Sequence, residues 1–114
     1  MPRKWNSEGS IVHPETNGLK LNEFEQRKGL SKAIRLYEQN ISRNSDEDNA
    51  FERLAVIYRS RNKVEDEIRV SKKAVAFYEH VVFDQHLESR LPLLNQFTKR
   101  LRAATSILAS QRNH

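Results

Sequence analysis

Residues 48–78 decide the fold, and their sequence is DNAFERLAVIYRSRNKVEDEIRVSKKAVAFY. In the first half, apolar side chains recur at the i, i+3, i+4 and i+7 spacing of one helical face: Phe51, Leu54, Ala55 and Tyr58. After a connector over residues 61–63, a second stripe follows: Val64, Ile68, Ser71, Val75, Tyr78 and Val82. Two helices that are each apolar on one face fold back on each other to bury those faces. The stretch therefore predicts an antiparallel helix-turn-helix pair, over about residues 49–60 and 64–82. Asn62, in the connector, tolerates the left-handed conformation that a tight exit from a helix needs.

A further helical segment is predicted before this pair. It runs over about residues 22–42, carries its own apolar stripe, and is expected to be interrupted near Gly29. The loop after it, residues 44–49, is rich in residues that cap helices. Asp48 is the predicted N-cap of the helix that follows.

The last helix is predicted to begin between Asp84 and Pro92 and to end near Ala109. Proline is tolerated in the first turn of a helix, which favours a start near Pro92. The predicted buried face of this helix consists of Leu87, Leu91, Leu94, Phe97, Leu101, Ala104 and Leu108.

The chain divides into three parts on these patterns. Residues 1–18 contain turn formers and no helical stripe, and are expected to be a flexible or irregular arm. Residues 19–83 are the predicted helical repeats, and residues 84–114 a capping helix with a short tail. The fold predicted is all-α, with about four helices.

Two segments that lie 34 residues apart repeat one stripe. Residues 28–41 align with residues 62–75, so that apolar positions coincide. Self-similarity at this period is typical of arrays of helix pairs. The two segments are therefore expected to play the same structural part.

The octet Phe51-x2-Leu54-Ala55-x2-Tyr58 places an aromatic residue, a leucine, a small residue and a tyrosine at the spacing of the motif W-x2-L-G-x2-Y. With this octet the chain resembles the tetratricopeptide repeat family, over about one and a half repeats in residues 28–78. In the earlier copy Ala33-x3-Tyr37 matches the A-x3-F motif of the second helix. The later copy departs from it, with Glu67 and Ser71 at these places, and both copies lack the closing proline.

The resemblance implies a function in binding. In this family the first helix of each repeat lines a concave groove that holds a peptide or another protein. By position, the groove would be lined here by Asn49, Glu52, Val56, Arg59 and Ser60. The residues alone leave an ordinary solvated helix face as an equal alternative. The arginines Arg53, Arg59 and Arg61 could hold an acidic peptide or a terminal carboxylate by paired hydrogen bonds.

So short an array is expected to need a cap. Fewer than about three such repeats rarely suffice alone. The last helix would cap the stack within the chain or by pairing with a second copy. Leu93 and Ile107 widen its apolar face, so a second copy of the chain is one expected partner, in a homodimer.

No catalytic or metal-binding pattern is present. The chain has no cysteine, and its four histidines are scattered without an H-E-x-x-H motif. Neither a phosphate-binding glycine loop nor a G-x-S-x-G motif occurs. A non-catalytic protein without cofactor or metal is therefore predicted. Glu67 falls near the packing face, and it is expected to form an ion pair with Arg53, Arg61 or the next helix.

The net charge of +5 comes from the C-terminal part. After residue 89 there are five basic side chains and no acidic one. The alternative function is therefore binding of nucleic acid or another polyanion through Arg90, Lys99, Arg100 and Arg102. No apolar run approaches the roughly 20 residues that span a bilayer, and no secretory signal is recognised at the start, so a cytoplasmic protein without membrane contact is expected.

Overall fold

The computed structural model describes residues 19–112. Both the predicted N-terminal arm, residues 1–18, and the last two residues lie outside the described part. Residues 19–112 form an all-α structure without a β-strand. Its α-helices are α1 (Glu23–Lys28), α2 (Leu30–Ser42), α3 (Ala50–Ser60), α4 (Val64–Glu79) and α5 (Leu91–Arg112). Short 3₁₀ turns cover Glu47–Asn49 and Glu88–Arg90, and a π-turn, His80–Asp84, extends α4.

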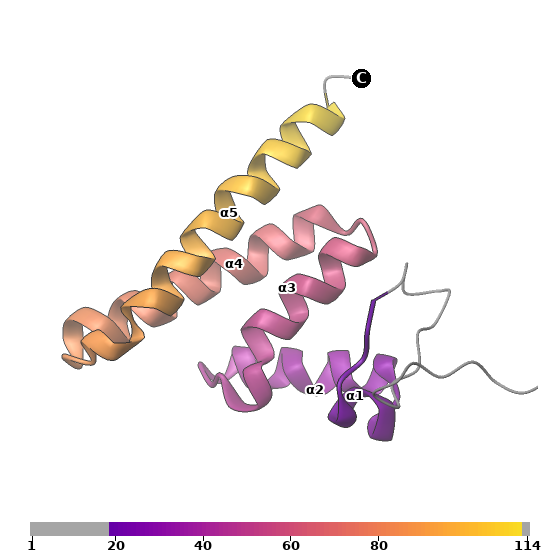
Figure 1. The fold of residues 1–114 in the computed structure, drawn as a ribbon, viewed down its shortest axis with the longest axis horizontal. Coiled ribbons are helices and arrows are strands. Elements are labelled where there is room, and N and C mark those ends of the chain that lie inside the picture. Colours follow the sequence, from indigo (N-terminus) through magenta and orange to yellow (C-terminus); the bar gives the residue numbers. More distant parts are fainter. Residues whose placement is uncertain (1–18, 113–114) are drawn as a thin grey trace, which may run out of the picture.

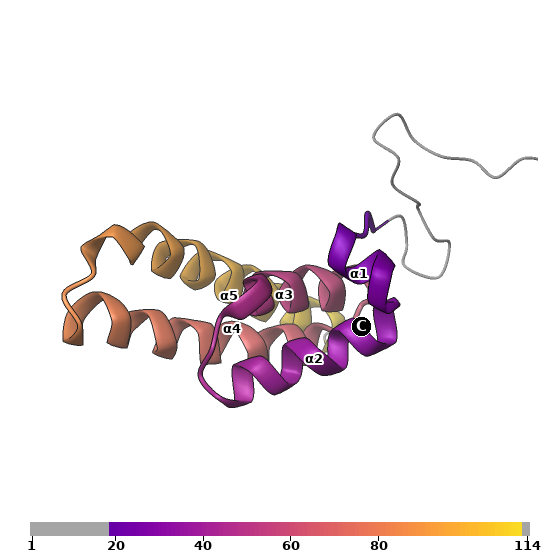
Figure 2. The ribbon, with the colours of Figure 1, turned by 90° about the horizontal axis from the view of Figure 1, so that it is seen from below.

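Helices that follow one another in the chain also pack together in space. α2 packs on α3, α3 on α4, and α4 on α5, and the short helix α1 lies against α2. α4 and α5 lie side by side and are joined at one end by the π-turn and the loop after it (Figures 1 and 2). α3 is thus a middle helix, with neighbours on two sides. This order of packing brings side chains of α3, α4 and α5 together.

The break between α1 and α2 was predicted and has a backbone cause. Gly29 adopts φ 88° and ψ 140°, a conformation that L side chains rarely reach. α1 starts with a capping box, in which the Asn22 side chain accepts from the Glu25 N–H and the Glu25 carboxylate accepts from the Asn22 N–H. A six-residue helix is marginal by itself, so these caps and its contacts with α2 and α3 hold it in place.

The predicted N-cap of α3 is wrong. Asp48 and Asn49 both have positive φ, 61° and 56°, and neither side chain caps the helix. The chain enters α3 through these two left-handed residues, and this brings the carboxylate of Asp46 to the helix start. Asp46 Oδ1 accepts from the N–H of Phe51 at 3.1 Å, and its other oxygen accepts from the hydroxyl of Tyr78. The left-handed exit expected at Asn62 is confirmed, with φ 59°.

Aromatic rings from three helices meet in the core. Phe51 of α3 lies 5.4 Å from Phe77 and 6.3 Å from Phe97, measured between ring centroids. Tyr78 stacks on Phe97 at 5.9 Å. Such clusters contribute beyond their buried area. Phe97 is thus the residue through which α5 joins the core of α3 and α4.

The predicted buried face of α5 is partly right. Leu94, Phe97 and Ala104 are buried, and Pro92 occupies the first turn as expected. Leu87 and Leu91 are 46% and 40% exposed, against expectation. Leu87 lies in the connection between the π-turn and α5, and Leu91 is the first residue of α5. Within residues 19–112, no helix combines the length and the apolar character that crossing a bilayer requires.

Candidate functional site

A buried carboxylate joins three helices. Glu67 of α4 is fully buried, and its carboxylate accepts from Arg59 of α3, from Nε at 2.5 Å and from Nη2 at 2.8 Å. Arg100 of α5 approaches the same carboxylate, with Nη1 3.3 Å from Oε2. The ion pair with the next helix is as predicted. The closest partner, Arg59, was not among the predicted candidates. Of those candidates, Arg53 pairs with Glu25 instead, and Arg61 forms no ion pair within residues 19–112.

A hollow of about 640 Å³ lies beside this ion pair, between the end of α3 and the first half of α5. Its lining consists of Arg59, Pro92, Asn95, Gln96, Lys99 and Arg100. The five α5 residues recur at i, i+3, i+4, i+7 and i+8, so they form one face of that helix. Three positive charges therefore border the hollow, and Glu67 supplies the one negative charge that directly contacts two of them.

The guanidinium of Arg100 is only partly satisfied. An arginine offers five N–H donors. Arg100 makes one contact to Glu67, and its buried Nε has no acceptor among the described residues. Lys99 is exposed and forms no ion pair within residues 19–112. The hollow consequently holds donors in excess of acceptors.

The residues of the predicted groove are distributed over more than one surface. Arg59 lines the hollow, whereas Asn49 lines a second hollow of about 320 Å³ at the other end of α3. Glu52, Val56 and Ser60 are half-buried; Val56 packs on the core, and the Ser60 hydroxyl donates to the carbonyl of Ile57. A middle helix such as α3 has neighbours on two sides, so little of its surface is open.

The basic residues predicted for the alternative function are also divided. Lys99 and Arg100 line the larger hollow, and Arg90 lines the smaller one beside Asn49. Arg102 is exposed further along α5. The structure thus unites Arg59 of the predicted groove with Lys99 and Arg100 of the predicted basic patch.

Sequence reasoning missed Pro92, Asn95 and Gln96 as lining residues. A signal for them existed, because the polar face of α5 can be drawn from the same helical spacing that gave its apolar face. The spacing does not show which other helix lies opposite this polar face.

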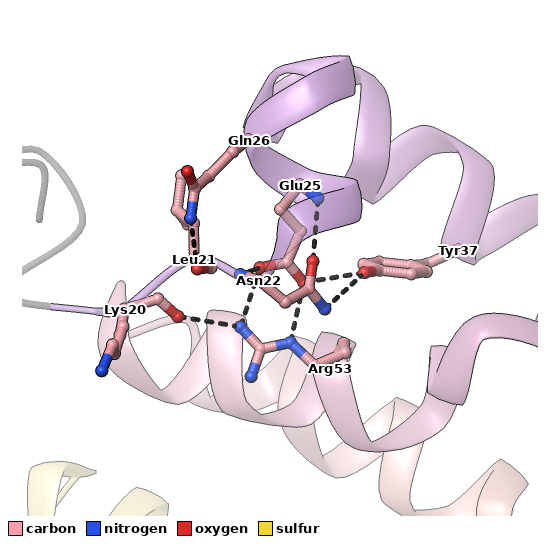
Figure 3. A network of polar contacts seen from close by, with 7 residues as sticks. All are labelled: Lys20, Leu21, Asn22, Glu25, Gln26, Tyr37 and Arg53. Atoms are coloured by element: carbon pink, nitrogen blue, oxygen red, sulfur yellow. Dashed lines mark hydrogen bonds and ion pairs between the residues drawn. The ribbon is translucent and has the colours of Figure 1, made fainter. Parts of the chain in front are cut away.

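A second polar network fixes α1 to α2 and α3 (Figure 3). Glu25 is fully buried and accepts from Arg53 Nε at 2.7 Å and Nη2 at 2.8 Å. It also accepts from the Tyr37 hydroxyl at 2.7 Å and from the Asn22 N–H at 3.1 Å. Burial by itself would raise the pKa of Glu25, but the donors from Arg53, Tyr37 and Asn22 outweigh it, and the pKa is lowered. Burial and the neighbouring Glu25 raise the pKa of Tyr37 to about 12.

A third network links α2 with α3 and α4. Glu38 accepts from the hydroxyl of Tyr58 and from Arg69 Nη2, the latter at 2.7 Å. Burial opposes ionisation of Glu38, but hydrogen bonds from Arg69 and Tyr58 prevail and lower its pKa. The pKa of Tyr58 is raised by burial and by Glu38. Both tyrosines therefore stay protonated near neutral pH and serve as hydrogen-bond donors.

The described residues contain no group of three or more histidine, cysteine, aspartate or glutamate side chains placed to hold a metal ion. Among the described residues, the buried carboxyl groups of Glu25 and Glu67 are both paired with arginine. What the larger hollow offers chemically is a set of cationic and amide donors. Comparison of the chain with protein-family models, with curated proteins and with solved structures finds no match.

Proposed function

We propose that the chain is a non-catalytic module that binds a protein or peptide at the hollow between α3 and α5. The observation that carries this proposal is that six side chains from two helices, mostly polar or charged, line an open concavity of about 640 Å³. Binding sites for ligands and peptides are concave and hold a few convergent polar groups. In this proposal the module is a cytoplasmic adaptor or regulatory domain.

A tetratricopeptide-like arrangement is part of the proposal. It is supported by the sequential packing of α2, α3, α4 and α5, and by the position of the Phe51–Tyr58 octet in the middle helix. In such an arrangement α3 and α5 are corresponding first helices of successive pairs, and together they form the concave face. Arg59 from α3 and Asn95 from α5 would then both contact the bound segment.

Binding of nucleic acid is less well supported. A duplex is held by several cations that follow its phosphate backbone. Arg90 and Lys99 line different hollows, and Arg100 is partly neutralised by Glu67. These cations do not form one continuous track.

Self-association is a second candidate, favoured by one observation. Phe83, Leu87 and Leu91 are 62%, 46% and 40% exposed around the connection between α4 and α5. Exposed apolar groups of this kind are typical of interaction surfaces. Light scattering over a dilution series tests it: a mass that stays at 13.4 kDa at all concentrations would exclude the homodimer.

The binding proposal is tested by filling the hollow. Asn95 is exposed and lines it, so Asn95→Trp would occupy the space without changing the core. Ser106→Trp is the matched control, since Ser106 is exposed on the same helix about 16 Å further along at 1.5 Å per residue. Peptides are selected on the wild-type protein from a random displayed library and then measured on both variants.

We expect selected peptides to bind wild type and Ser106→Trp alike and to lose at least about tenfold in affinity on Asn95→Trp, a difference of about 1.4 kcal/mol. A library that yields no binder, or binders that are indifferent to Asn95→Trp, would refute the proposal. Circular dichroism of both variants verifies that they are folded.

A further inference from the structure

We infer that the hollow between α3 and α5 selects a peptide segment rich in carboxylates, held by Arg59, Lys99 and Arg100. This inference rests on the proposed function and specifies the chemistry of its ligand. It follows from the charges that border the hollow, from the unsatisfied donors there, and from the shape of the site.

The charge balance of the hollow favours an anion. Arg59 and Arg100 both face the single carboxylate of Glu67, and Lys99 has no acidic partner within residues 19–112. Like charges gathered in this way repel one another, and an added carboxylate relieves the repulsion. Because the side chain of Glu67 is fully buried, it is not itself part of the exposed surface of the hollow.

The available donors fit a carboxylate. Arg59 uses Nε and Nη2 for Glu67, and its side chain is 36% exposed. Arg100 makes one long contact to Glu67, and its side chain is 21% exposed. Guanidinium groups match carboxylates in geometry and bind them with two parallel hydrogen bonds.

Two further side chains favour a peptide over a phosphate polymer. Asn95 and Gln96 each carry an amide that donates and accepts, as the backbone of an extended peptide requires. Pro92 adds an apolar surface at the end of the hollow, against which an aliphatic stem can rest. The polyanionic alternative would use the cations alone and would extend beyond the hollow to Arg90 and Arg102.

The test compares two labelled ten-residue peptides that differ only in charge, one with glutamate at alternate positions and one with glutamine there. Their fluorescence anisotropy is followed as the full chain is added, at low salt and again at about 0.15 M salt. A labelled DNA duplex and inorganic phosphate, added as a competitor, are the other arms. We expect the glutamate peptide to bind with a dissociation constant below about 1 mM and at least tenfold more tightly than the glutamine peptide.

Lys99→Glu is the diagnostic variant, because Lys99 lines the hollow, is exposed and has no partner in the described structure whose loss would unfold it. Lys72→Glu is its matched control, since Lys72 is exposed on α4, outside the hollow, and the change in net charge is the same. We expect Lys99→Glu to weaken the glutamate peptide at least tenfold and Lys72→Glu less than threefold at 0.15 M salt, where charges beyond about 8 Å are screened.

The outcomes separate this inference from the proposed function. Equal binding of both peptides, with loss on Asn95→Trp, would overturn the carboxylate preference and leave peptide binding standing. Tight binding of the duplex with no binding of either peptide would overturn both and favour the polyanion function. Displacement of the glutamate peptide by inorganic phosphate would show an unselective anion site and overturn the inference. Equal loss on Lys99→Glu and Lys72→Glu would assign the binding to overall charge, which also overturns it.

Discussion

Replacing Arg53 by methionine is the most informative single perturbation of the fold. The carboxylate of Glu25 is fully buried and has four hydrogen bonds, two of them from Arg53. Methionine keeps the aliphatic stem of the arginine but removes both of these donors and the positive charge. Two neutral donors, the Tyr37 hydroxyl and the Asn22 N–H, then remain for a buried anion.

The expected magnitude is about 3 kcal/mol of unfolding free energy near pH 7. Removing one partner of a buried ion pair typically costs about 3–5 kcal/mol, because the other charge is left without compensation. The lower end applies here, since the Arg53 side chain is 18% exposed and water can enter its place. For a domain of this size, about 3 kcal/mol lowers the midpoint of thermal unfolding by about 12–24 °C.

The assay is urea and thermal unfolding followed by circular dichroism, for a double-mutant cycle with Glu25→Gln. The double variant holds no buried charge at this place, so we expect it to be more stable than Arg53→Met alone. The pH dependence gives an independent check. In the wild type the pKa of Glu25 lies below its ordinary value of 4.5, so its stabilising contribution is full above pH 4.5 and is lost as the pH falls through the lowered pKa. The difference between wild type and Arg53→Met must therefore narrow in acid.

Either of two results would show that Glu25 is not a buried anion held by Arg53. The first is a loss of less than about 1 kcal/mol in Arg53→Met, which would mean that Glu25 is hydrated or protonated rather than buried as an ion. The second is a difference in unfolding free energy between the two proteins that stays constant from about pH 7 to about pH 3.5. A constant difference would mean that the contact does not change the pKa of Glu25.

Three further predictions concern the backbone and the third network. Gly29→Ala should destabilise the fold by about 1–3 kcal/mol in urea unfolding, because φ 88° is strained for alanine although an added Cβ would have open space; an unchanged midpoint would contradict the break between α1 and α2. Tyr58→Ala should cost about 3 kcal/mol or more, as for other large core residues, and thermal melting that matches the wild type would reject the packing of α3. The pKa of Glu38 is lowered, so stability due to its pair with Arg69 is lost below its ordinary value of 4.5, and Glu38→Gln should show a shallower fall in stability with acid than the wild type, as measured by melting across pH.

The helices were predictable because local patterns determine them. Apolar stripes at helical spacing gave the extents of α3 and α4 to within a few residues. Gly29 and Pro92 mark helix boundaries through their own backbone chemistry, and so did Asn62. Each of these signals lies within a few residues of the feature that it predicts.

Other features depend on the path of the backbone and on contacts between distant residues, which no local sequence pattern shows. Residues 44–49 offer several side chains that can cap a helix, and the backbone path through Asp48 and Asn49 decides that Asp46 does so. Arg53 and Arg59 are six residues apart on one helix, and at 3.6 residues per turn their side chains point about 120° apart around the helix axis. Their partners, Glu25 and Glu67, lie 28 residues before Arg53 and eight residues after Arg59.

The candidate site shows the same limit. Arg59 was assigned to a groove on α3, and Lys99 and Arg100 to a basic surface on the last helix. Only the packing of α5 next to α3 and α4 reveals that one hollow contains all three. The sequence contains all three basic residues, but only the tertiary contacts bring them together in one hollow.

The uneven anchoring of α5 has a consequence for local motion. Leu94, Phe97 and Ala104 are buried, and among the described residues none of the helix after Ala104 is. The last two turns are held at the exposed contacts Gln111–Asn62 and Arg112–Glu65. Amide protons of the last turns should therefore exchange with solvent through low-energy local openings, while those around Phe97 exchange only as the whole domain opens. The hollow lies on the anchored half of α5, so the part of α5 that lines it is already ordered before a ligand arrives. Binding therefore loses little free energy to immobilising the backbone.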